Sequence, residues 1–310
     1  RSGTGIGELK SKLEKLLSKS PPRLDLGRPR LPIDRVFTIA GFGTVVTGTL
    51  LDGSLKLGEE VEIQPTGLRA RIRGLQTHKK KEEIALPGSR TAINISGIQV
   101  DQVERGHVVI RPGEFQPSRR LDASFRMLKD AKASLKHNST IKFFQGTDEV
   151  MGRVRVLGGE ELMPGETGWI QLELSHPVVA VRQDHYILRR PSPPETLGGG
   201  LIIDPAPIGR HSRYSSSVQK KLSAMVQGAP EEVLLQVGQS LGVVGYRELI
   251  DACHLGADAA DTALKALLAS GELVLVSESD LMNVGNESLV VTRTNWEEVQ
   301  KHILELVGNF

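Results

Sequence analysis

The feature that most constrains the fold is residues 34–190, where short strand-like segments follow one another without a helical period. These segments are rich in β-branched and aliphatic residues and end at glycine or proline, which is typical of antiparallel strands joined by turns. One segment alternates strictly, so that Arg69, Arg71 and Arg73 are expected to share one face of a strand. The region is therefore predicted to be built from β-sheets.

The strand-like segments fall into two sets of about six. The first set is "RVFTIA", "TVVTGTLL", "EEVEIQP", "LRARIRGLQ", "SRTAINIS" and "HVVIRPG". The second set is "RRLDASFRML", "TIKFFQG", "MGRVRVLG", "GWIQLELS", "VVAVRQD" and "HYILRR". Two such runs predict two small antiparallel β-barrels, over residues 31–113 and 114–191.

The pattern becomes helical toward the C-terminus. Residues 192–214, which include "PSPPETLGGG", have no periodicity and are predicted to be a linker. Helical segments follow at roughly 215–227, 230–241, 246–253 and 259–269, and then come two β-rich runs around polar turns. This order predicts a winged-helix domain over 215–292. Residues 293–310 are interpreted as the start of a second winged helix.

The N-terminal residues 1–20 form an amphipathic pattern, with Ile6, Leu9, Leu13 and Leu16 on one face. A lone amphipathic helix buries nothing by itself. We interpret it as the C-terminal helix of a domain that this chain lacks, followed by a proline-rich linker over residues 21–30.

The charge is unevenly distributed. Residues 215–310 contain 6 Lys and Arg against 13 Asp and Glu, a net charge of −7. Because the whole chain has a net charge of +2, residues 1–214 carry a net charge of +9. The basic part suits a polyanionic partner, whereas the acidic part does not favour general nucleic-acid binding. A single cysteine, Cys253, excludes an internal disulfide and is interpreted as a small core residue of a cytoplasmic protein. The eight histidines show no metal-ligand spacing.

The glycine-rich stretch "GFGTVVTGTL", Gly41 to Leu50, raises the question of a phosphate-binding loop. A P-loop needs the pattern G-x-x-x-x-G-K-[ST] and a following helix, whose N-terminus holds the phosphate. The stretch lacks the lysine and continues into β-branched residues, and no P-loop pattern occurs elsewhere in the chain. It is therefore predicted to be a β-hairpin.

The same stretch resembles the second domain of translational GTPases of the EF-Tu family. The resemblance extends to "DRVFTI" before it, and to "GEEVEI" and "VERGHVV" after it. Three longer segments, "LPIDRVFTIAGFGTVVTGTLLDGSLKLGEE", "GRVRVLGGEELMPGETGWIQLEL" and "RRPSPPETLGGGLIIDPAP", are similar to the selenocysteine-specific elongation factors within that family. One departure is "FFQGT", where many members of the family have a histidine before the Gly-Thr pair.

This resemblance implies a selenocysteine pocket formed by Asp34, Arg35 and Arg90 in the first barrel. Selenocysteine is largely an anion at neutral pH whereas serine is neutral, and two guanidinium groups offer fixed positive charge to that anion. From the residues alone, the same three side chains are also consistent with solvated surface charges.

The resemblance also implies selenocysteinyl-tRNA and the ribosome as partners of a monomeric factor that acts at recoded UGA codons. Arg69, Arg71 and Arg73 in the first barrel, and His137, Lys142, Arg153 and Arg189 in the second, are candidate tRNA contacts, with exposed barrel charges as the alternative. The basic run Lys79–Lys81 is interpreted equally as a solvated loop tip or as an RNA-backbone contact. GTP and Mg²⁺ are expected on the missing N-terminal domain, so this chain by itself is not expected to be an enzyme. The mRNA hairpin is expected to bind winged helices that lie beyond this chain.

Two other functions remain open at this point. The chain could belong to another EF-Tu-like GTPase, or it could be a winged-helix DNA-binding regulator with β-barrel domains. The negative charge of residues 215–310 disfavours the regulator, because DNA-reading helices usually carry several cations or amides.

Overall fold

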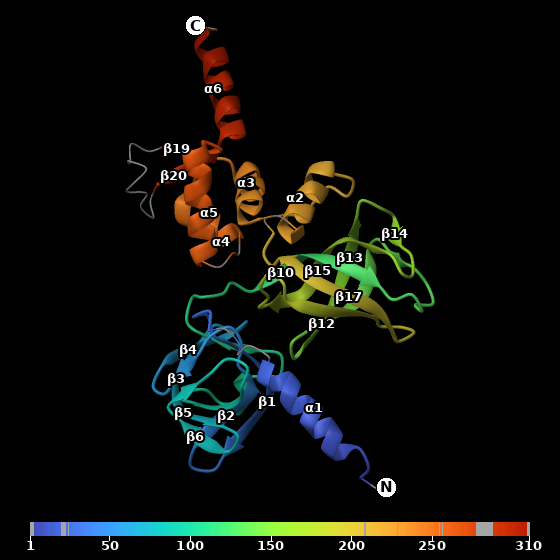
Figure 1. Cartoon of the computed structure of the whole chain (residues 1–310), viewed down its shortest axis with the longest axis vertical. Helices are drawn as coiled ribbons and strands as arrows, with labels where there is room; N and C mark the ends of the chain where they lie inside the picture. Colours follow the sequence, from blue (N-terminus) through green and yellow to red (C-terminus); the bar gives the residue numbers. More distant parts are fainter. Residues whose placement is uncertain are drawn as a thin grey trace. The chain divides into compact units, whose positions relative to one another are not determined.

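A computed structural model describes residues 3–19, 23, 25–207, 209–227, 229–253, 255, 257–276 and 288–308. The chain divides into two compact units, residues 1–115 and 116–310 (Figure 1). No helix in the described part of the chain combines the length and the apolar character needed to cross a membrane.

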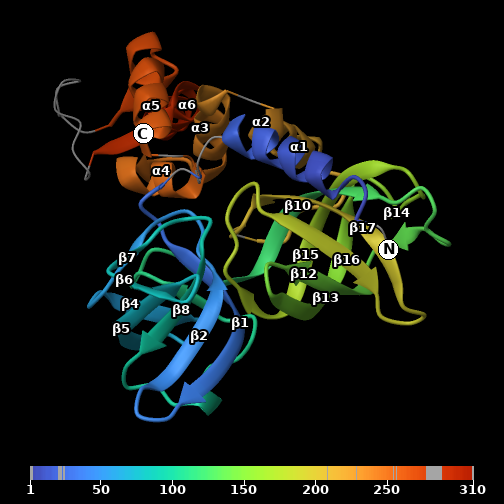
Figure 2. The same ribbon diagram turned by 60° about the horizontal axis from the view of Figure 1, so that its bottom comes forward.

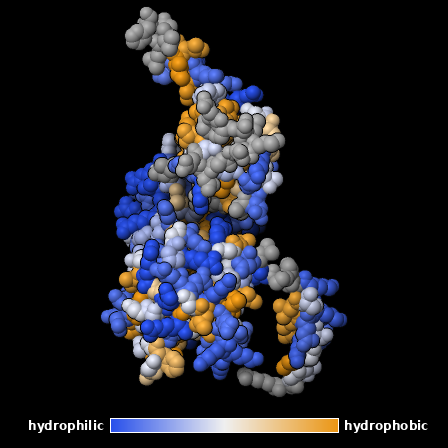
Figure 3. Space-filling model, turned by 90° about the vertical axis from the view of Figure 1, so that its left-hand side faces the viewer, coloured by the Kyte–Doolittle hydropathy of each residue, from blue (hydrophilic) through white to orange (hydrophobic). Residues whose placement is uncertain are grey.

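The first unit begins with the predicted helix, α1 (Ile6–Lys19), which has no buried residue. Ile6, Leu9, Leu13, Leu16 and Leu17 are all exposed. Their side chains form an apolar stripe along one side of the helix (Figure 3). The amphipathic pattern is confirmed, and part of the predicted linker that follows lies outside the described residues.

The remainder of the first unit is a closed six-stranded antiparallel barrel. The ring order is β4-β9-β1-β2-β8-β5, and a pairing between β5 and β4 closes it. The strands are β1 (Arg30–Ile39), β2 (Gly43–Thr49), β4 (Glu60–Gln64), β5 (Leu68–Thr77), β8 (Arg90–Ile95) and β9 (Val108–Ile110). All six predicted strand segments are confirmed. Short elements that the sequence did not predict are β3 (Leu55–Lys56), β6 (Lys80–Glu82), β7 (Ile84–Ala85) and the 3-10 helix Val100–Gln102.

The stretch "GFGTVVTGTL" forms the predicted hairpin between β1 and β2. Ile39 pairs with Gly43, and Gly41 in the turn has a φ of 79°, which glycine adopts without strain. A Cβ at Gly48 would lie 2.2 Å from the carbonyl oxygen of Pro32, so this glycine lets β1 and β2 approach closely. The motif therefore serves strand packing.

The second unit contains another closed barrel, in the order β10-β15-β13-β12-β16-β17. Its strands are β10 (Ser118–Met127), β12 (Ser139–Gln145), β13 (Asp148–Leu157), β15 (Thr167–Val178), β16 (His185–Arg190) and β17 (Glu195–Asp204). A small ribbon joins β11 (Leu135–Lys136) and β14 (Glu161–Leu162). The prediction of two antiparallel barrels is confirmed.

Two predictions about this barrel were wrong in detail. "VVAVRQD" is not a separate strand, because β15 ends at Val178 and Gln183 adopts a positive φ of 71° in the loop that follows. The predicted linker 192–214 contains β17, which closes the barrel between β16 and β10.

The three glycines of β17 explain why its sequence does not resemble a strand. A Cβ at Gly198 would lie 2.2 Å from the Arg126 carbonyl oxygen, and one at Gly200 would lie 1.9 Å from the Ser124 carbonyl oxygen. The backbone of β17 lies so close to β10 that side chains are excluded at these positions. Such glycines are typical of tight barrel corners.

The C-terminal region is helical. It contains α2 (Ser216–Gln227), α3 (Pro230–Leu241), α4 (Tyr246–Cys253), α5 (Ala257–Ser270) and α6 (Arg293–Gly308). The predicted helices are confirmed. A three-stranded sheet joins β18 (Val244–Gly245), β20 (Leu289–Thr292) and β19 (Leu273–Leu275), and the polar turns predicted between the last two lie outside the described residues.

One hydrophobic core joins α2, α3, α4 and α5 to the outer surface of the second barrel. It includes Leu157 and Ile203 of the barrel, Leu222 of α2 and Leu264 of α5. Cys253 lies in the same core with no exposed surface, and burial raises the pKa of its thiol to about 12. The interpretation of Cys253 as a small core residue is thus confirmed.

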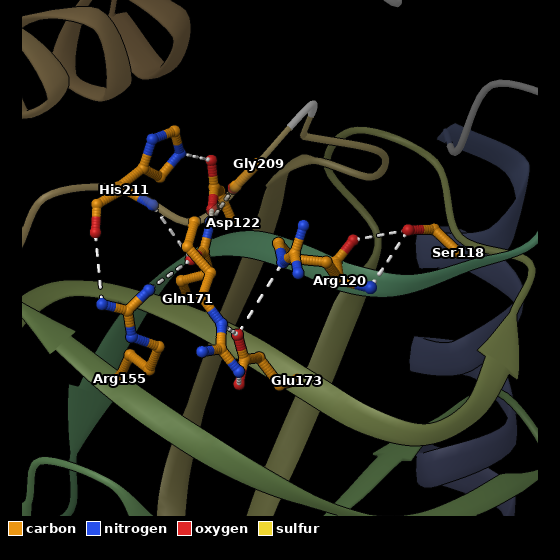
Figure 4. A network of polar contacts seen from close by, with 9 residues as sticks. Ser118, Arg120, Asp122, Arg155, Gln171, Glu173, Gly209 and His211 are labelled. Carbon is orange, nitrogen blue, oxygen red and sulfur yellow. Dashed lines mark hydrogen bonds and ion pairs between the residues drawn. The ribbon is translucent and has the colours of Figure 1, made fainter.

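A buried polar network fixes the segment between β17 and α2 onto the second barrel (Figure 4). Gln171 donates from Nε2 to Asp122 Oδ1 at 2.8 Å and to the Gly209 carbonyl oxygen at 3.0 Å. The carboxylate of Asp122 also bonds His211 Nε2. Asp122 and Gln171 are completely buried. Because buried polar groups are costly without partners, this network ties Gly209 and His211 to the barrel wall.

Candidate functional site

The predicted pocket residue Asp34 lies at a β-bulge in β1. The register with β2 runs from Ile33–Gly48 directly to Arg35–Thr47, so Asp34 is the extra residue on its strand. A bulge bends the strand and redirects a side chain, and bulges are frequent next to functional sites.

Asp34 and Arg90 are brought together across three strands. Thr47 Oγ1 donates to Asp34 Oδ1 at 2.7 Å. Arg90 Nη2 donates to the same oxygen at 3.1 Å, and Nη1 donates to Oδ2. Arg90 reaches the carboxylate because it pairs with Thr49 on β2, two residues from Thr47. This bidentate contact fixes the plane of the guanidinium group.

The electrostatic environment keeps Asp34 ionised. Burial raises the pKa of its carboxyl, but the hydrogen bonds from Arg90 and Thr47 and the charges of Arg90 and Arg35 lower the pKa below its ordinary value overall. The hydrogen bonds that Arg90 donates to Asp34 in turn raise the pKa of Arg90. Since the folded pKa of Asp34 is depressed, its contribution to stability is present above its unfolded pKa of about 4 and is lost as the pH falls through the folded value.

Arg35 lies beside this pair and remains available to a ligand. Its side chain is exposed and forms no hydrogen bond or ion pair with any described residue. The three groups together carry a net charge of +1, with several N–H donors of Arg35 and Arg90 still unused. This arrangement can bind a small anion next to a carboxylate. Thr47 was not predicted as part of the site, although it lies within the "GFGTVVTGTL" motif.

The three candidate arginines of β5 point outward as predicted. Arg69, Arg71 and Arg73 are exposed, while Ala70 and Ile72 between them are buried. The Arg69 guanidinium group lies 3.9 Å from Glu60, whereas the guanidinium groups of Arg71 and Arg73 form no hydrogen bond or ion pair with any described residue. The strand therefore presents two uncompensated cations.

The candidates on the second barrel differ in their surroundings. Lys142 on β12 is directly opposite Arg189 on β16, and its Nζ lies 2.6 Å from Glu149 Oε1. Arg153 is exposed beside a shallow open hollow that Thr140 and Met151 also line. His137 is half-buried and bonds the Val156 carbonyl oxygen at 3.2 Å through Nδ1. The structure thus brings Lys142 and Arg189 together but leaves His137 engaged within the barrel.

The described residues contain no group of three or more His, Cys, Asp or Glu side chains that could hold a metal ion.

Comparisons with known proteins identify both barrels. Residues 43–110 match the family model of elongation factor Tu domain 2, and residues 122–208 match that of the β-barrel domain of the selenocysteine-specific elongation factor. These matches define the class of the two barrels as that found in translation elongation factors of the EF-Tu type.

Two relatives narrow this class. The chain is 40% identical over 234 residues to the selenocysteine-specific elongation factor of Desulfomicrobium baculatum. The aligned region covers 76% of this chain and 37% of the relative. The crystal structure of the translation elongation factor SelB of Methanococcus maripaludis, in its apo form, matches with a TM-score of 0.57 and 25% identity over 66% of this chain and 49% of that chain. The chain therefore spans little more than a third of the bacterial relative's length. It is a homologue of the selenocysteine-specific elongation factors, as the resemblance in its sequence predicted.

Proposed function

We propose that this chain is part of a selenocysteine-specific elongation factor that binds selenocysteinyl-tRNA for delivery to the ribosome at recoded UGA codons. The observation that carries the proposal is the Asp34–Arg90 pair beside the unpartnered Arg35 in a barrel of the EF-Tu domain 2 type. The bacterial relative named for this function is 40% identical to the chain.

The chemistry of the site favours selenocysteine over serine. The selenolate carries a negative charge that Arg35 and Arg90 can balance, whereas the serine hydroxyl leaves both cations unbalanced. Asp34 holds the guanidinium group of Arg90 in place and can accept a hydrogen bond from the amino group of the aminoacyl ester. Discrimination by charge and hydrogen bonding can exceed discrimination by size.

We assign the other segments supporting roles. The exposed arginines of β5, together with Lys142, Arg153 and Arg189 on the second barrel, are proposed to contact the tRNA backbone. His137 is retained as a candidate through the hydrogen-bonding capacity of its other ring nitrogen. GTP and Mg²⁺ would be held by a domain that precedes α1, and the factor is proposed to act as a monomer in the cytoplasm.

The C-terminal region is proposed to be a winged helix that acts as a spacer or a protein contact. Its element order, α2, α3, β18, α4, α5, β19 and β20, with the three strands in one sheet, supports this interpretation. The one lysine of α5, Lys265, is paired with Asp261 at 2.7 Å, which leaves this helix poorly suited to reading DNA. The mRNA hairpin would be bound by further winged helices.

Replacing Arg90 by alanine tests the proposed pocket. The affinity of the full-length protein for selenocysteinyl-tRNA is expected to fall about 10- to 100-fold, because the substitution removes one cation and leaves the carboxylate of Asp34 to repel the selenolate. The affinity for seryl-tRNA is expected to change much less. Equilibrium binding of the two aminoacyl-tRNAs measures both effects.

Arg119→Ala is the matched control, because Arg119 is an exposed arginine outside the proposed pocket. It is expected to leave the ratio of the two affinities unchanged. An equal loss of both affinities in Arg90→Ala would contradict the assignment of Arg90 to the recognition of selenium.

A further inference from the structure

The segment that enters the first barrel is bound to it through its backbone. Residues 25–29 lie at the end of the barrel where β1 begins (Figure 2). The amides of Leu26 and Arg28 both donate to the Asp52 carbonyl oxygen, at 2.9 and 3.1 Å. The amide of Arg30 donates to the Leu51 carbonyl oxygen at 2.9 Å. Residues 25–30, which the sequence places in a linker, are thus bound to the barrel wall.

Gly53 allows this segment to approach the barrel closely. A Cβ at Gly53 would lie 2.5 Å from the backbone nitrogen of Pro29 and 2.8 Å from that of Arg28. Pro29 is buried at this contact, and its ring restricts the backbone of the segment further. The entering segment is therefore held in one conformation by the residues that follow β2.

Arg30 connects the start of β1 to the segment that leaves the barrel. Its side chain is buried, with 3% of the residue exposed, and Nε donates to Asp52 Oδ2 at 2.7 Å. The guanidinium carbon lies 5.8 Å from the centroid of the Phe115 ring, which follows β9. A buried arginine is costly without an anionic partner, and an aromatic ring beside it adds a cation–π attraction. Arg30 therefore contacts both a loop of the barrel and the segment that leaves it.

Arg111, the first residue after β9, makes the same connection from the other side. Its Nε donates to Glu59, and its Nη1 donates to the carbonyl oxygen of Gly27 in the entering segment. Nη1 also lies 3.4 Å from Glu114 Oε1, and Nη2 donates to the Ser54 carbonyl oxygen at 3.0 Å. The planar guanidinium group presents several donors in fixed directions, which a lysine ammonium group cannot do. One side chain thus joins the entering segment, the barrel and the leaving segment.

We propose that Arg30 and Arg111 form a clasp that ties the segment entering the first barrel to the segment leaving it, so that both segments turn with the barrel as one body. Any rotation of the preceding part of the chain relative to the barrel then takes place before Asp25 and not within residues 25–30. A displacement of the entering segment passes through the two guanidinium groups directly to residues 111–115. The clasp shares no residue with the proposed selenocysteine pocket and does not depend on the function of that pocket.

Amide hydrogen exchange of the 310-residue chain tests the clasp. Arg111→Ala is expected to speed exchange of the Leu26 and Arg28 amides about 10- to 100-fold, because the entering segment loses its hydrogen bond to a charged group. The amides of β2 and β8 are expected to exchange as in the wild type. Arg111→Lys, which keeps the charge but loses the planar fork, is expected to give a smaller increase at the same amides. Arg119→Ala, which removes an exposed arginine outside the clasp, is expected to change none of them.

A variant of the leaving segment tests whether the two segments are coupled. Phe115→Ala removes the ring beside Arg30 and is expected to speed exchange of the Arg30 and Leu26 amides about 3- to 10-fold, although Phe115 lies at the other end of the barrel sequence. A change confined to residues 112–116 in this variant would overturn the coupling. An equal increase throughout β2 and β8 in Arg111→Ala and Arg111→Lys would show that Arg111 stabilises the whole barrel, and would overturn the clasp.

Discussion

Replacing Gly200 by alanine is expected to lower the free energy of unfolding of the second barrel by about 3 kcal/mol. The added Cβ would lie 1.9 Å from the Ser124 carbonyl oxygen, which belongs to the backbone of β10 and cannot rotate away. That oxygen also accepts a hydrogen bond from the buried hydroxyl of Tyr186 at 2.7 Å. The substitution therefore forces the strands apart and leaves a buried hydroxyl without its acceptor.

Thermal unfolding followed by circular dichroism measures this effect. For a unit of this size, a loss of about 3 kcal/mol corresponds to a fall in melting temperature of about 6–12 °C. Gly159→Ala is the control, since a Cβ at Gly159 has its nearest neighbour at 3.6 Å and the residue has no positive φ. A melting temperature for Gly200→Ala equal to that of the control would show that β10 and β17 are not as close as described.

Replacing Asp122 by alanine is expected to destabilise the second unit by about 3 kcal/mol, because it removes one partner from a buried charged network. Gln171 loses one of its two acceptors, and the half-buried imidazole of His211 loses its carboxylate. The segment between β17 and α2 then keeps the hydrogen bond from Gln171 to the Gly209 carbonyl oxygen and the ion pair of Arg210 with Glu173, but it loses the buried bond between His211 and Asp122.

Limited proteolysis with trypsin detects whether the segment between β17 and α2 has detached from the barrel, because Arg210 and Arg213 lie within this segment. The wild type is expected to resist cleavage there under conditions in which Asp122→Ala is cut. Asp130→Ala, which removes an exposed carboxylate on the same barrel, is expected to change stability by less than about 0.5 kcal/mol and to remain uncut. Equal resistance of Asp122→Ala and wild type would mean that the network does not hold the segment.

The strands of both barrels could be predicted from sequence where side chains alternate. In β5, buried Ala70 and Ile72 lie between exposed arginines, and this alternation predicts a strand with one face in the core. β17 could not be predicted in this way, because the close approach of β10 replaces its central side chains with glycines. Glycine triplets usually indicate loops, and only the tertiary contacts show that these residues form a strand.

The pocket was predicted from resemblance, and its geometry came from the structure. Asp34 and Arg90 are 56 residues apart, and no local pattern relates them. The bulge at Asp34 and the hydrogen bond from Thr47 depend on the register between β1 and β2, which a single sequence does not specify.

The affinity of the wild-type full-length protein for selenocysteinyl-tRNA and seryl-tRNA, measured with the same tRNA body, tests the central claim most directly. We expect selenocysteinyl-tRNA to bind at least about 10-fold more tightly, which corresponds to about 1.4 kcal/mol of discrimination at the pocket. Equal affinities for the two would contradict the proposal that Asp34, Arg35 and Arg90 recognise selenocysteine.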